Sequence, residues 1–403
     1  MAPLFRFAVV GLAAVALGAG PVAAQSTSPG VTDAEIVIGL TAPMSGPAAI
    51  YGNLAVAKEA WARYVNDLGG VHGRKLKVGI KDDGFNPGRA VANIKEMRDS
   101  VFLTVGLVGS AVVNAAKDEI AEARLPLINA YASPQVWARQ PKDKIKSVFI
   151  DYPDYADEAD YLVTYSVTRL GAQKLAVFYQ NDDWGKGAMD GVNRAMKALG
   201  AKATLAAAVP YEVSDRELGT QALKFKESGA DTLFLAALNT HSANLVREMA
   251  KVGYRPRLVG SFTIGDHQVM YRLLGELWEG AYYNVLGAVP GEPEAKAVLD
   301  ILIKYEPKLQ GREGTALAGA ANMIIAVEGL KKAGRNLTRD GFIEAMEGIR
   351  FEAARRLLEE TDLPLKRIAE RCGFGAEETL RRVFLRRIAT TPGEYRRRFA
   401  AFA

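Results

Sequence analysis

Two pairs of adjacent aspartates and three scattered histidines stand out in this 403-residue chain as residues that could do acid–base or metal chemistry. The pairs are Asp82-Asp83 and Asp182-Asp183, and each follows a short apolar run typical of a β-strand. Aspartates at strand ends commonly accept hydrogen bonds from the following turn, so we interpret both pairs as turn-forming residues. The histidines are expected on the surface or in loops. Since the chain has no His-Glu metal motif, phosphate-cradling loop or nucleophile elbow, the sequence favours a binding protein without metal or cofactor over an enzyme.

Small hydroxyl residues follow three predicted strands and could bind an anionic group. Ser45 follows the first strand, Ser110 the third, and Ser133, preceded by Ala132, the fourth. In parallel α/β sheets, ligands bind outside the carboxyl ends of the strands, where helix N-termini and free backbone N–H groups collect. A small side chain there lets the backbone approach a ligand carboxylate and adds a hydroxyl donor. The alternative is that these residues only cap helices and close turns.

The elements that must position these residues alternate between short apolar runs and amphipathic stretches, which indicates βα units in parallel sheets and an α/β fold. A body of roughly 320 residues exceeds one hydrophobic core, so we expect two lobes, with a crossing between them near residues 146–152. The predicted strands are Ile36–Leu40, Leu76–Lys81, Thr104–Val108, Pro126–Ala130, Leu175–Gln180, Thr204–Val209, Thr232–Ala237 and Arg257–Gly260. The predicted helices are Asn53–Leu68, Gly88–Arg98, Val113–Ala123, Tyr155–Arg169, Gly187–Leu199, Arg216–Ser228 and Ser242–Val252.

Residues 1–24 have the composition of a secretory signal peptide. Arg6 supplies a positive charge, Phe7–Ala19 is an apolar run, and Val22-Ala23-Ala24 offers the small residues that precede a cleavage site. The run is short for a membrane span, and no later stretch is apolar for long enough, so we expect a soluble mature chain. The single cysteine, Cys372, cannot form an internal disulfide.

Three segments of the body, in order, resemble the branched-chain amino-acid type of periplasmic binding protein. They are IVIGLTAPMSGPAAIYGNLAVAKEAWARYVNDLGGVHGRKLKVGIKDDGFNP (36–87), VGLVGSAVVNAAKDEIAEARLPLINAYAS (105–133) and KLAVFYQNDDWGKGAMDGV (174–192). The resemblance covers residues 35 to about 350 and implies the type I periplasmic-binding-protein fold, whose lobes close over a ligand about a hinge. It implies a first lobe at about 31–150 and 286–350, and a second at about 151–285. It also implies export to the periplasm and ABC permease subunits as partners.

The resemblance further implies which residues contact the ligand. Trp184 stands where the family usually has a tyrosine whose ring covers the ligand when the cleft closes. Phe262 stands near the position where a leucine-binding relative places a carboxylate against the ligand ammonium group. Because phenylalanine cannot accept that hydrogen bond, an apolar or aromatic carboxylate or amide fits better than a branched-chain amino acid, unless Asp151 or Asp154 supplies the charge. The predicted ligand-binding residues are Ser45, Tyr51, Ser110, Tyr131, Ala132, Ser133, Trp184, Asn239 and Phe262.

The C-terminal segment differs from the body in its charge. Residues 352–403 contain 12 basic and 8 acidic residues, a net charge of +4, whereas the other 351 residues contain 39 and 38, a net charge of +1. This segment is therefore the only candidate for nucleic-acid binding. AARRLLEETDLPLKRIAERCGFGAEETLRRVFLRRIATTPGEYRRRF (353–399) resembles the second helix-turn-helix of the AraC/XylS regulators. The resemblance implies a first helix at 365–372 and a recognition helix at 376–388.

Opposite faces of the predicted recognition helix are expected to differ in role. Leu380, Phe384 and Ile388 share one face at helical spacing and should pack inward. Ala389 stands where the family usually has glycine, and a left-handed conformation there would cost alanine about 1 kcal/mol. The DNA-contacting residues that the resemblance implies are Glu377, Glu378 and Arg381 in the groove, with Arg382 and Arg386 nearer the phosphates.

Three hypotheses follow, because the two ends of the chain point to different compartments. A periplasmic solute-binding component of an ABC importer, which binds an amino acid or a related apolar or aromatic carboxylate or amide, accounts for the signal peptide and most of the chain. A cytoplasmic, ligand-responsive transcription regulator accounts for the tail. An inactive fusion accounts for the join near Phe351, where the helix predicted at Arg339–Glu347 is followed neither by the family's closing strands nor by a linker. The first hypothesis is favoured because it explains the most sequence.

Overall fold

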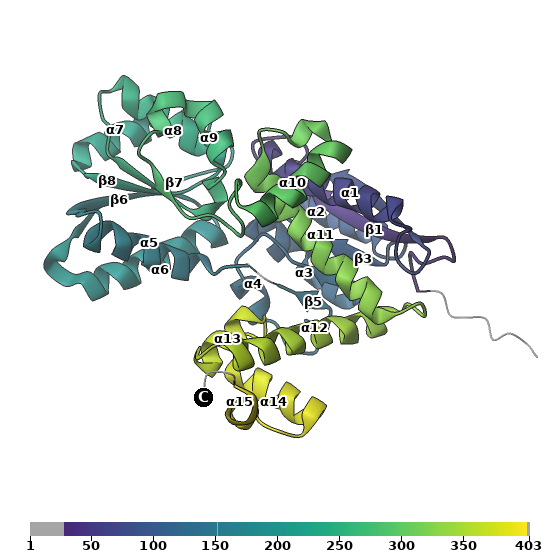
Figure 1. Ribbon diagram of the computed structural model, residues 1–403. Helices are drawn as coiled ribbons and strands as arrows, with labels where there is room; N and C mark the ends of the chain where they lie inside the picture. The colour runs from purple at the N-terminus through teal and green to yellow at the C-terminus, as the bar shows by residue number, and fades with distance from the viewer. Residues whose placement is uncertain (1–27, 151, 401–403) are drawn as a thin grey trace, which may run out of the picture.

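The computed structural model describes residues 28–150 and 152–400 and consists of two α/β lobes and a helical tail (Figure 1). Each lobe has a sheet of five parallel strands between two layers of helices, which confirms the predicted fold class. The predicted signal peptide and Asp151 lie outside the described residues. None of the helices described is long and apolar enough to cross a membrane.

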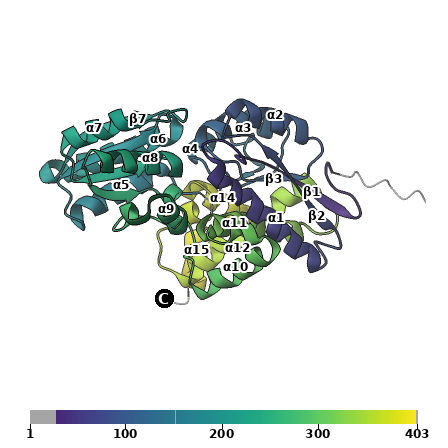
Figure 2. The same cartoon turned by 90° about the horizontal axis from the view of Figure 1, so that it is seen from above.

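The sheet of the first lobe has the strand order β2-β1-β3-β4-β5. Buried residues of α1 and α11 pack on one of its faces, and those of α2 and α3 on the other (Figure 2). The strands are β1 (Glu35–Ala42), β2 (Lys75–Asp82), β3 (Leu103–Val105), β4 (Leu127–Ile128) and β5 (Val148–Phe149). The helices are α1 (Gly52–Asp67), α2 (Pro87–Met97), α3 (Ser110–Glu122), α4 (Gln135–Ala138), α10 (Pro293–Tyr305) and α11 (Glu313–Ala333).

The sheet of the second lobe has the order β10-β9-β8-β6-β7, which repeats the winding of the first sheet. Figure 1 shows α5 and α6 on one face of this sheet and α7, α8 and α9 on the other. The strands are β6 (Lys174–Gln180), β7 (Thr204–Tyr211), β8 (Thr232–Ala236), β9 (Arg257–Gly260) and β10 (Tyr282–Tyr283). The helices are α5 (Tyr155–Thr168), α6 (Asp183–Leu199), α7 (Gly219–Ser228), α8 (Asn239–Lys251) and α9 (His267–Leu274).

All eight predicted strands are present, and their apolar residues form the cores of the two lobes. The strand β10 was missed because its two residues are too few to produce a pattern. The expectation that all histidines lie in loops or on the surface is wrong for His241, which is buried in α8 and stacks on Tyr211 with a ring-centroid distance of 4.4 Å.

A single helix, α12 (Arg339–Glu360), runs through the predicted join at Phe351. The prediction of a helix that stops at Glu347 is therefore wrong. Phe342 and Met346 of α12 pack into the first lobe, whereas Phe351 and Leu358 pack against the tail. The helix continues because these apolar residues recur at helical spacing and no proline follows until residue 364.

The tail adds three helices, α13 (Leu365–Arg371), α14 (Glu377–Ile388) and α15 (Pro392–Phe399); Figure 1 shows α13 beside the end of α12, with α14 and α15 below. Leu380 and Phe384 of α14 are buried as predicted. Ile388 is 38% exposed, so its predicted burial is wrong. It is the last residue of α14, and the chain turns away after it at Ala389, whose φ of 51° is left-handed as anticipated.

Candidate ligand-binding cleft

A cavity of about 340 Å³, here called the interlobe cleft, lies between the carboxyl ends of the two sheets. Its wall in the first lobe includes Ser110, which follows β3, and Tyr131, which follows β4. Its wall in the second lobe includes Trp184, which follows β6, and Phe262, which follows β9. In both sheets the winding reverses beside the first strand, and this switch point is where open α/β sheets bind ligands.

Aromatic side chains make up much of this wall. Tyr152, in the crossing between the lobes, meets Tyr131 and Phe262 edge-on, with ring centroids 5.7 and 5.2 Å apart. Tyr155 stacks on Phe262 at 5.6 Å and lies 5.5 Å from Trp184. Burial raises the pKa of Tyr131, Tyr152 and Tyr155 well above the ordinary value, so these rings stay neutral. The wall therefore suits the apolar body of a ligand.

Hydrogen-bond donors face the cleft without an acceptor among the described residues. Trp184 is only 5% exposed, and its indole N–H has no hydrogen-bond partner; the buried hydroxyl of Thr263 also has none. Ser110 begins α3, and its Oγ accepts from the Ser133 N–H at 3.1 Å, which leaves its own hydrogen free to donate. An unpaired buried donor costs about 1–3 kcal/mol, so an acceptor atom of a ligand would be stabilised here.

The position of Trp184 is fixed by the start of α6. Asp182 caps this helix by accepting from the N–H groups of Trp184 at 3.0 Å and Gly185 at 3.1 Å. A Cβ atom on Gly185 would lie 1.8 Å from the carbonyl oxygen of Gln180, so only glycine allows α6 to begin this close to β6. These bonds confirm the interpretation of Asp182 as a turn-forming residue.

The carboxylates near the cleft already have donors. Asp266 lines the cleft and accepts from the N–H of Val269 at 3.2 Å and from the N–H and hydroxyl of Thr315, both at 3.0 Å. Glu158 accepts from the Ser261 hydroxyl at 2.7 Å and the Phe262 N–H at 2.6 Å. Burial raises the pKa of Glu158 to about 7. Neither carboxylate is a free partner for a ligand ammonium group.

The lobes are held together at the cleft by polar contacts. The bond between Asp266 and Thr315 joins the second lobe to the start of α11. The Tyr51 hydroxyl donates to the Thr263 carbonyl at 3.1 Å, and the Thr240 hydroxyl donates to the Pro47 carbonyl at 3.0 Å. The cleft is therefore in a closed arrangement.

Five of the nine predicted ligand-binding residues line the interlobe cleft, namely Tyr51, Ser110, Tyr131, Trp184 and Phe262. Ser45 does not, because β1 pairs with β2 in a register that places Asp82 opposite Ala42, next to the turn. The exposed Ser45 donates its hydroxyl to Asp82 at 2.5 Å.

The other three residues are buried behind the cleft wall. Ala132 packs in the core beneath α3. Ser133 accepts from the Gln135 N–H at 3.3 Å, and the Asn239 side chain contacts Met270 Sδ at 3.3 Å. Asp154, the suggested source of a charge, caps α5 and accepts from the Gln135 side chain at 2.9 Å, outside the cleft. The sequence interpretation missed Tyr152, Tyr155, Glu158 and Asp266.

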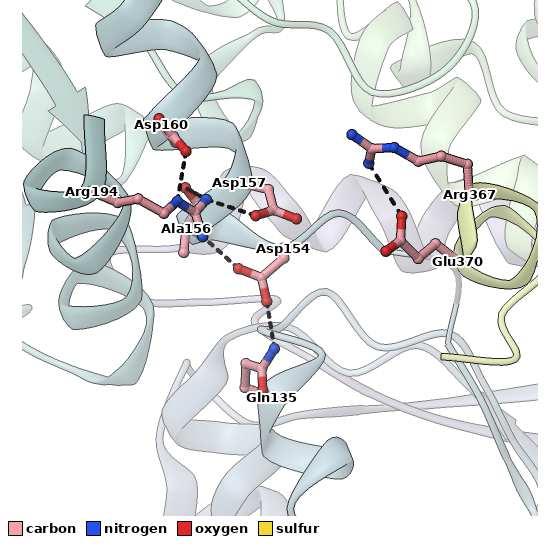
Figure 3. Close-up of polar contacts among 8 residues, drawn as sticks. All are labelled: Gln135, Asp154, Ala156, Asp157, Asp160, Arg194, Arg367 and Glu370. Atoms are coloured by element: carbon pink, nitrogen blue, oxygen red, sulfur yellow. Dashed lines mark hydrogen bonds and ion pairs between the residues drawn. The ribbon is translucent and has the colours of Figure 1, made fainter. Parts of the chain in front are cut away.

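A second, larger cavity of about 1370 Å³, here called the hinge–tail space, lies between the lobe crossings and the tail. Figure 3 shows some of its polar side chains, among them Asp154 and Asp157 near the start of α5 and Arg367 and Glu370 on α13. Arg367 pairs with Glu370 at 3.2 Å, and Arg194 pairs with Asp157 at 2.7 Å. Some of the charges that line this space are thus paired within the protein, whereas Lys142, Lys146 and Arg371 are exposed and make no ion pair with a described residue.

The residues that were expected to contact DNA are exposed, but two of the arginines have acidic partners. Arg386 pairs with Glu347 of α12 at 2.6 Å, and Arg381 pairs with Glu378 at 3.5 Å. Glu377 and Arg382 are exposed and make no ion pair with a described residue. Arg386 thus holds α14 against α12 rather than extending freely from the recognition helix.

Comparisons with known proteins were made on the whole chain. A family model described as periplasmic binding protein matches residues 35–369. The Leu/Ile/Val-binding protein homolog 1 of Brucella abortus is 25% identical over 306 residues, which are 75% of this chain and 80% of the relative. The fatty acid ABC transporter substrate-binding protein from Thermomonospora curvata matches with a TM-score of 0.68 at 24% identity, covering 79% of this chain and 82% of that chain. The branched-chain amino acid transporter substrate-binding protein LivJ from Streptococcus pneumoniae, in complex with isoleucine, matches with a TM-score of 0.66 at 18% identity, covering 77% and 87%.

Proposed function

The chain belongs to the periplasmic binding protein family, and we propose that it is the solute-binding component of an ABC importer whose ligand is an apolar or aromatic carboxylate or amide. The relatives described above carry names for amino-acid and fatty-acid binding, and the likeness supports transport of a small organic acid. The proposal places the protein in the periplasm, with export through the predicted signal peptide and with permease subunits as partners.

The observation that carries the ligand class is the polarity of the interlobe cleft. Its walls are aromatic, and it offers the donors Trp184 Nε1 and the Thr263 hydroxyl, which have no partner, and the Ser110 hydroxyl, which so far only accepts a bond. Its one lining carboxylate, Asp266, already accepts three hydrogen bonds. A ligand with an acceptor group and an apolar body satisfies these donors, whereas an α-ammonium group would have to compete for Asp266.

Binding requires motion of the lobes rather than chemistry. The ligand acceptor group first meets Ser110 and Tyr131 of the first lobe. The second lobe then rotates about the two crossings and brings Trp184 and Phe262 over the ligand. Closure also forms the hydrogen bond between Asp266 and Thr315, which stabilises the closed arrangement. In this proposal, the permease recognises that closed arrangement.

A thermal unfolding screen tests this proposal. The probes are 3-phenylpropionate, 4-methylpentanoate, their primary amides, leucine and phenylalanine. A ligand present at 100 times its Kd stabilises the folded state by about 2.7 kcal/mol, so binding raises the unfolding temperature measurably. We expect the carboxylates or amides to raise it more than the amino acids do. A shift with the amino acids alone would contradict the proposed ligand class.

The DNA-binding alternative is not proposed, because no described feature of the tail favours it over the transport role. Arg386 is engaged by Glu347, and the apolar residues of α14 are used to pack the tail against α12. The tail is thus an extension of the first lobe through a continuous helix.

A further inference from the structure

A buried lysine lies behind the wall of the interlobe cleft. Lys58 of α1 is only 2% exposed, and its ammonium nitrogen lies 4.9 Å from the centroid of the Tyr131 ring. Space for it exists because residue 106 is glycine: a Cβ atom there would lie 2.4 Å from Lys58 Nζ. Lys58 therefore occupies a site formed by α1, the end of β3 and Tyr131.

The ammonium group of Lys58 has no anionic partner among the described residues. No described carboxylate makes an ion pair with it, and burial, without any opposing charge, lowers its pKa to about 7. The titratable side chain placed against it is that of Tyr131, which burial keeps neutral. An unpaired buried ammonium group is unfavourable, so an anion brought near it would be bound more tightly.

The interlobe cleft is where such an anion would lie. Tyr131 lines the cleft, and the Lys58 ammonium group lies over its ring, so the same ring borders both the ligand space and the ammonium group. Gly106 lies four residues before Ser110, and Ser110 begins α3 at the same carboxyl edge of the first sheet. A carboxylate that accepts from Ser110 would therefore lie on the wall behind which Lys58 is buried, where little water screens the attraction.

We propose that Lys58 is the buried countercharge of the ligand, so that the cleft selects an anionic carboxylate over the isosteric neutral amide. This inference rests on the proposed function and narrows its ligand class. Because the charge acts through the Tyr131 ring rather than by contact, Lys58 determines specificity and is not a hydrogen-bonding ligand residue.

Binding of an anion would also favour the protonated form of Lys58. The group titrates near pH 7 in the free protein, so its protonation must increase when a carboxylate binds. Carboxylate affinity should then be highest below pH 7 and fall as the pH rises above it. Glu158, which faces Phe262 from the second lobe, titrates in the same range and requires its own control, Glu158→Gln.

Calorimetric titration of three proteins with 3-phenylpropionate and 3-phenylpropionamide tests the inference. The proteins are the wild type, Lys58→Met and the matched control Lys304→Met, which removes an exposed lysine that also lies over a tyrosine ring, 5.5 Å from its centroid. We expect Lys58→Met to weaken carboxylate binding by roughly tenfold and to leave amide binding within about twofold. Lys304→Met should change neither. Equal losses for both ligands, or no loss, would overturn the inference.

A measurement on the wild type alone guards against a Lys58→Met protein that folds poorly. Titrations at pH 7.5 in phosphate and in Tris, whose ionisation enthalpies differ, report the protons taken up on binding. We expect net uptake with 3-phenylpropionate, retained in Glu158→Gln, and none with the amide. Absence of uptake overturns the role of Lys58. Tighter binding of the amide also overturns it while leaving the proposed function intact, whereas failure of every screened ligand to bind would overturn both.

Discussion

The interlobe cleft and the hinge–tail space differ in size and in how their polar groups are satisfied. The hinge–tail space is about four times larger, and its charged side chains are either paired, as Arg367 is with Glu370, or exposed to solvent, as Lys142 is. The smaller cleft is aromatic and leaves the Trp184 and Thr263 donors without partners. In the hinge–tail space, the lining residue Trp137 also has a buried indole N–H without a hydrogen-bond partner.

This difference teaches that volume alone does not identify the ligand site. A space whose charged groups are already paired or exposed to water gains little from a ligand, because each new contact must replace an existing ion pair or a hydrated group. A compact aromatic cleft with unpaired donors gains both apolar burial and hydrogen bonds. Changes in the cleft should therefore alter affinity, and changes in the hinge–tail space should not.

The largest effect on this contrast is expected from Trp184→Ala. The change removes an aromatic wall and an unpaired donor, and truncation of such a buried anchor costs roughly 2–4 kcal/mol of binding energy. Calorimetry with the best ligand from the screen measures the loss. The control is Trp137→Ala, which removes a buried tryptophan from the hinge–tail space and should leave affinity within about threefold. Equal losses in the two variants would erase the distinction between the cavities.

Glu158→Gln tests the hinge–tail space through stability instead. Burial raises the pKa of Glu158 to about 7 in the folded state, above the ordinary 4.5, so the folded state binds more protons between these pH values. Stability should fall as the pH rises from about 4.5 to 7, by up to about 3 kcal/mol for this group. Urea unfolding at pH 5 and pH 8 should show this loss in the wild type relative to the variant. Parallel behaviour of the two proteins would contradict the account.

Two helix-capping aspartates of the second lobe, each bonded to a residue of the first lobe, provide a matched pair. Asp266 bonds to Thr315 across the cleft, and Asp154 bonds to Gln135 beside the crossing after β5. Asp266→Ala should shift the free protein toward the open arrangement. The charge-assisted hydrogen bonds that it removes are present only when the lobes are closed, and they stabilise that arrangement by about 2 kcal/mol. Small-angle X-ray scattering should show a larger radius of gyration for Asp266→Ala and no change for Asp154→Ala. A larger radius of gyration for Asp154→Ala than for Asp266→Ala would contradict the assignment of the Asp266–Thr315 contact as the one that opening breaks.

The smallest expected effect concerns the tail. Ala389 has a φ of 51°, where glycine has no steric penalty, so Ala389→Gly should stabilise the tail by about 1 kcal/mol. Ala353→Gly, in the exposed middle of α12, should destabilise it by a similar amount. Protease susceptibility of the tail compares the two variants. If both variants changed the protease susceptibility of the tail in the same direction, the left-handed conformation of Ala389 would be contradicted.

The sequence predicted the lobes well because their strands are buried on both faces and read as short apolar runs between amphipathic helices. Its errors have long-range causes. Ser45 is held by Asp82, which is distant in sequence and adjacent only through the β1–β2 register. Nothing local distinguishes it from Ser110, which does reach the cleft.

The missed cleft residues lie where the sequence has no periodic signal. Tyr152 is in a crossing, and Tyr155 is the first residue of α5, a position that pattern analysis assigns only to the helix. Asp266 lies directly before α9, four residues after Phe262, where no periodic pattern marks it as a cleft residue. The predicted join at Phe351 does not interrupt α12, because a change in composition does not end a helix whose apolar residues continue at helical spacing.

The position of a bound ligand tests the central claim most directly. Crystals grown with 3-(4-bromophenyl)propionate would locate the bromine by anomalous scattering, free of any assumption about the fold. We predict one bromine peak in the interlobe cleft, with the carboxylate between Ser110 and Trp184. A peak only in the hinge–tail space, beside Arg367 and Asp157, would contradict the assignment of the ligand site.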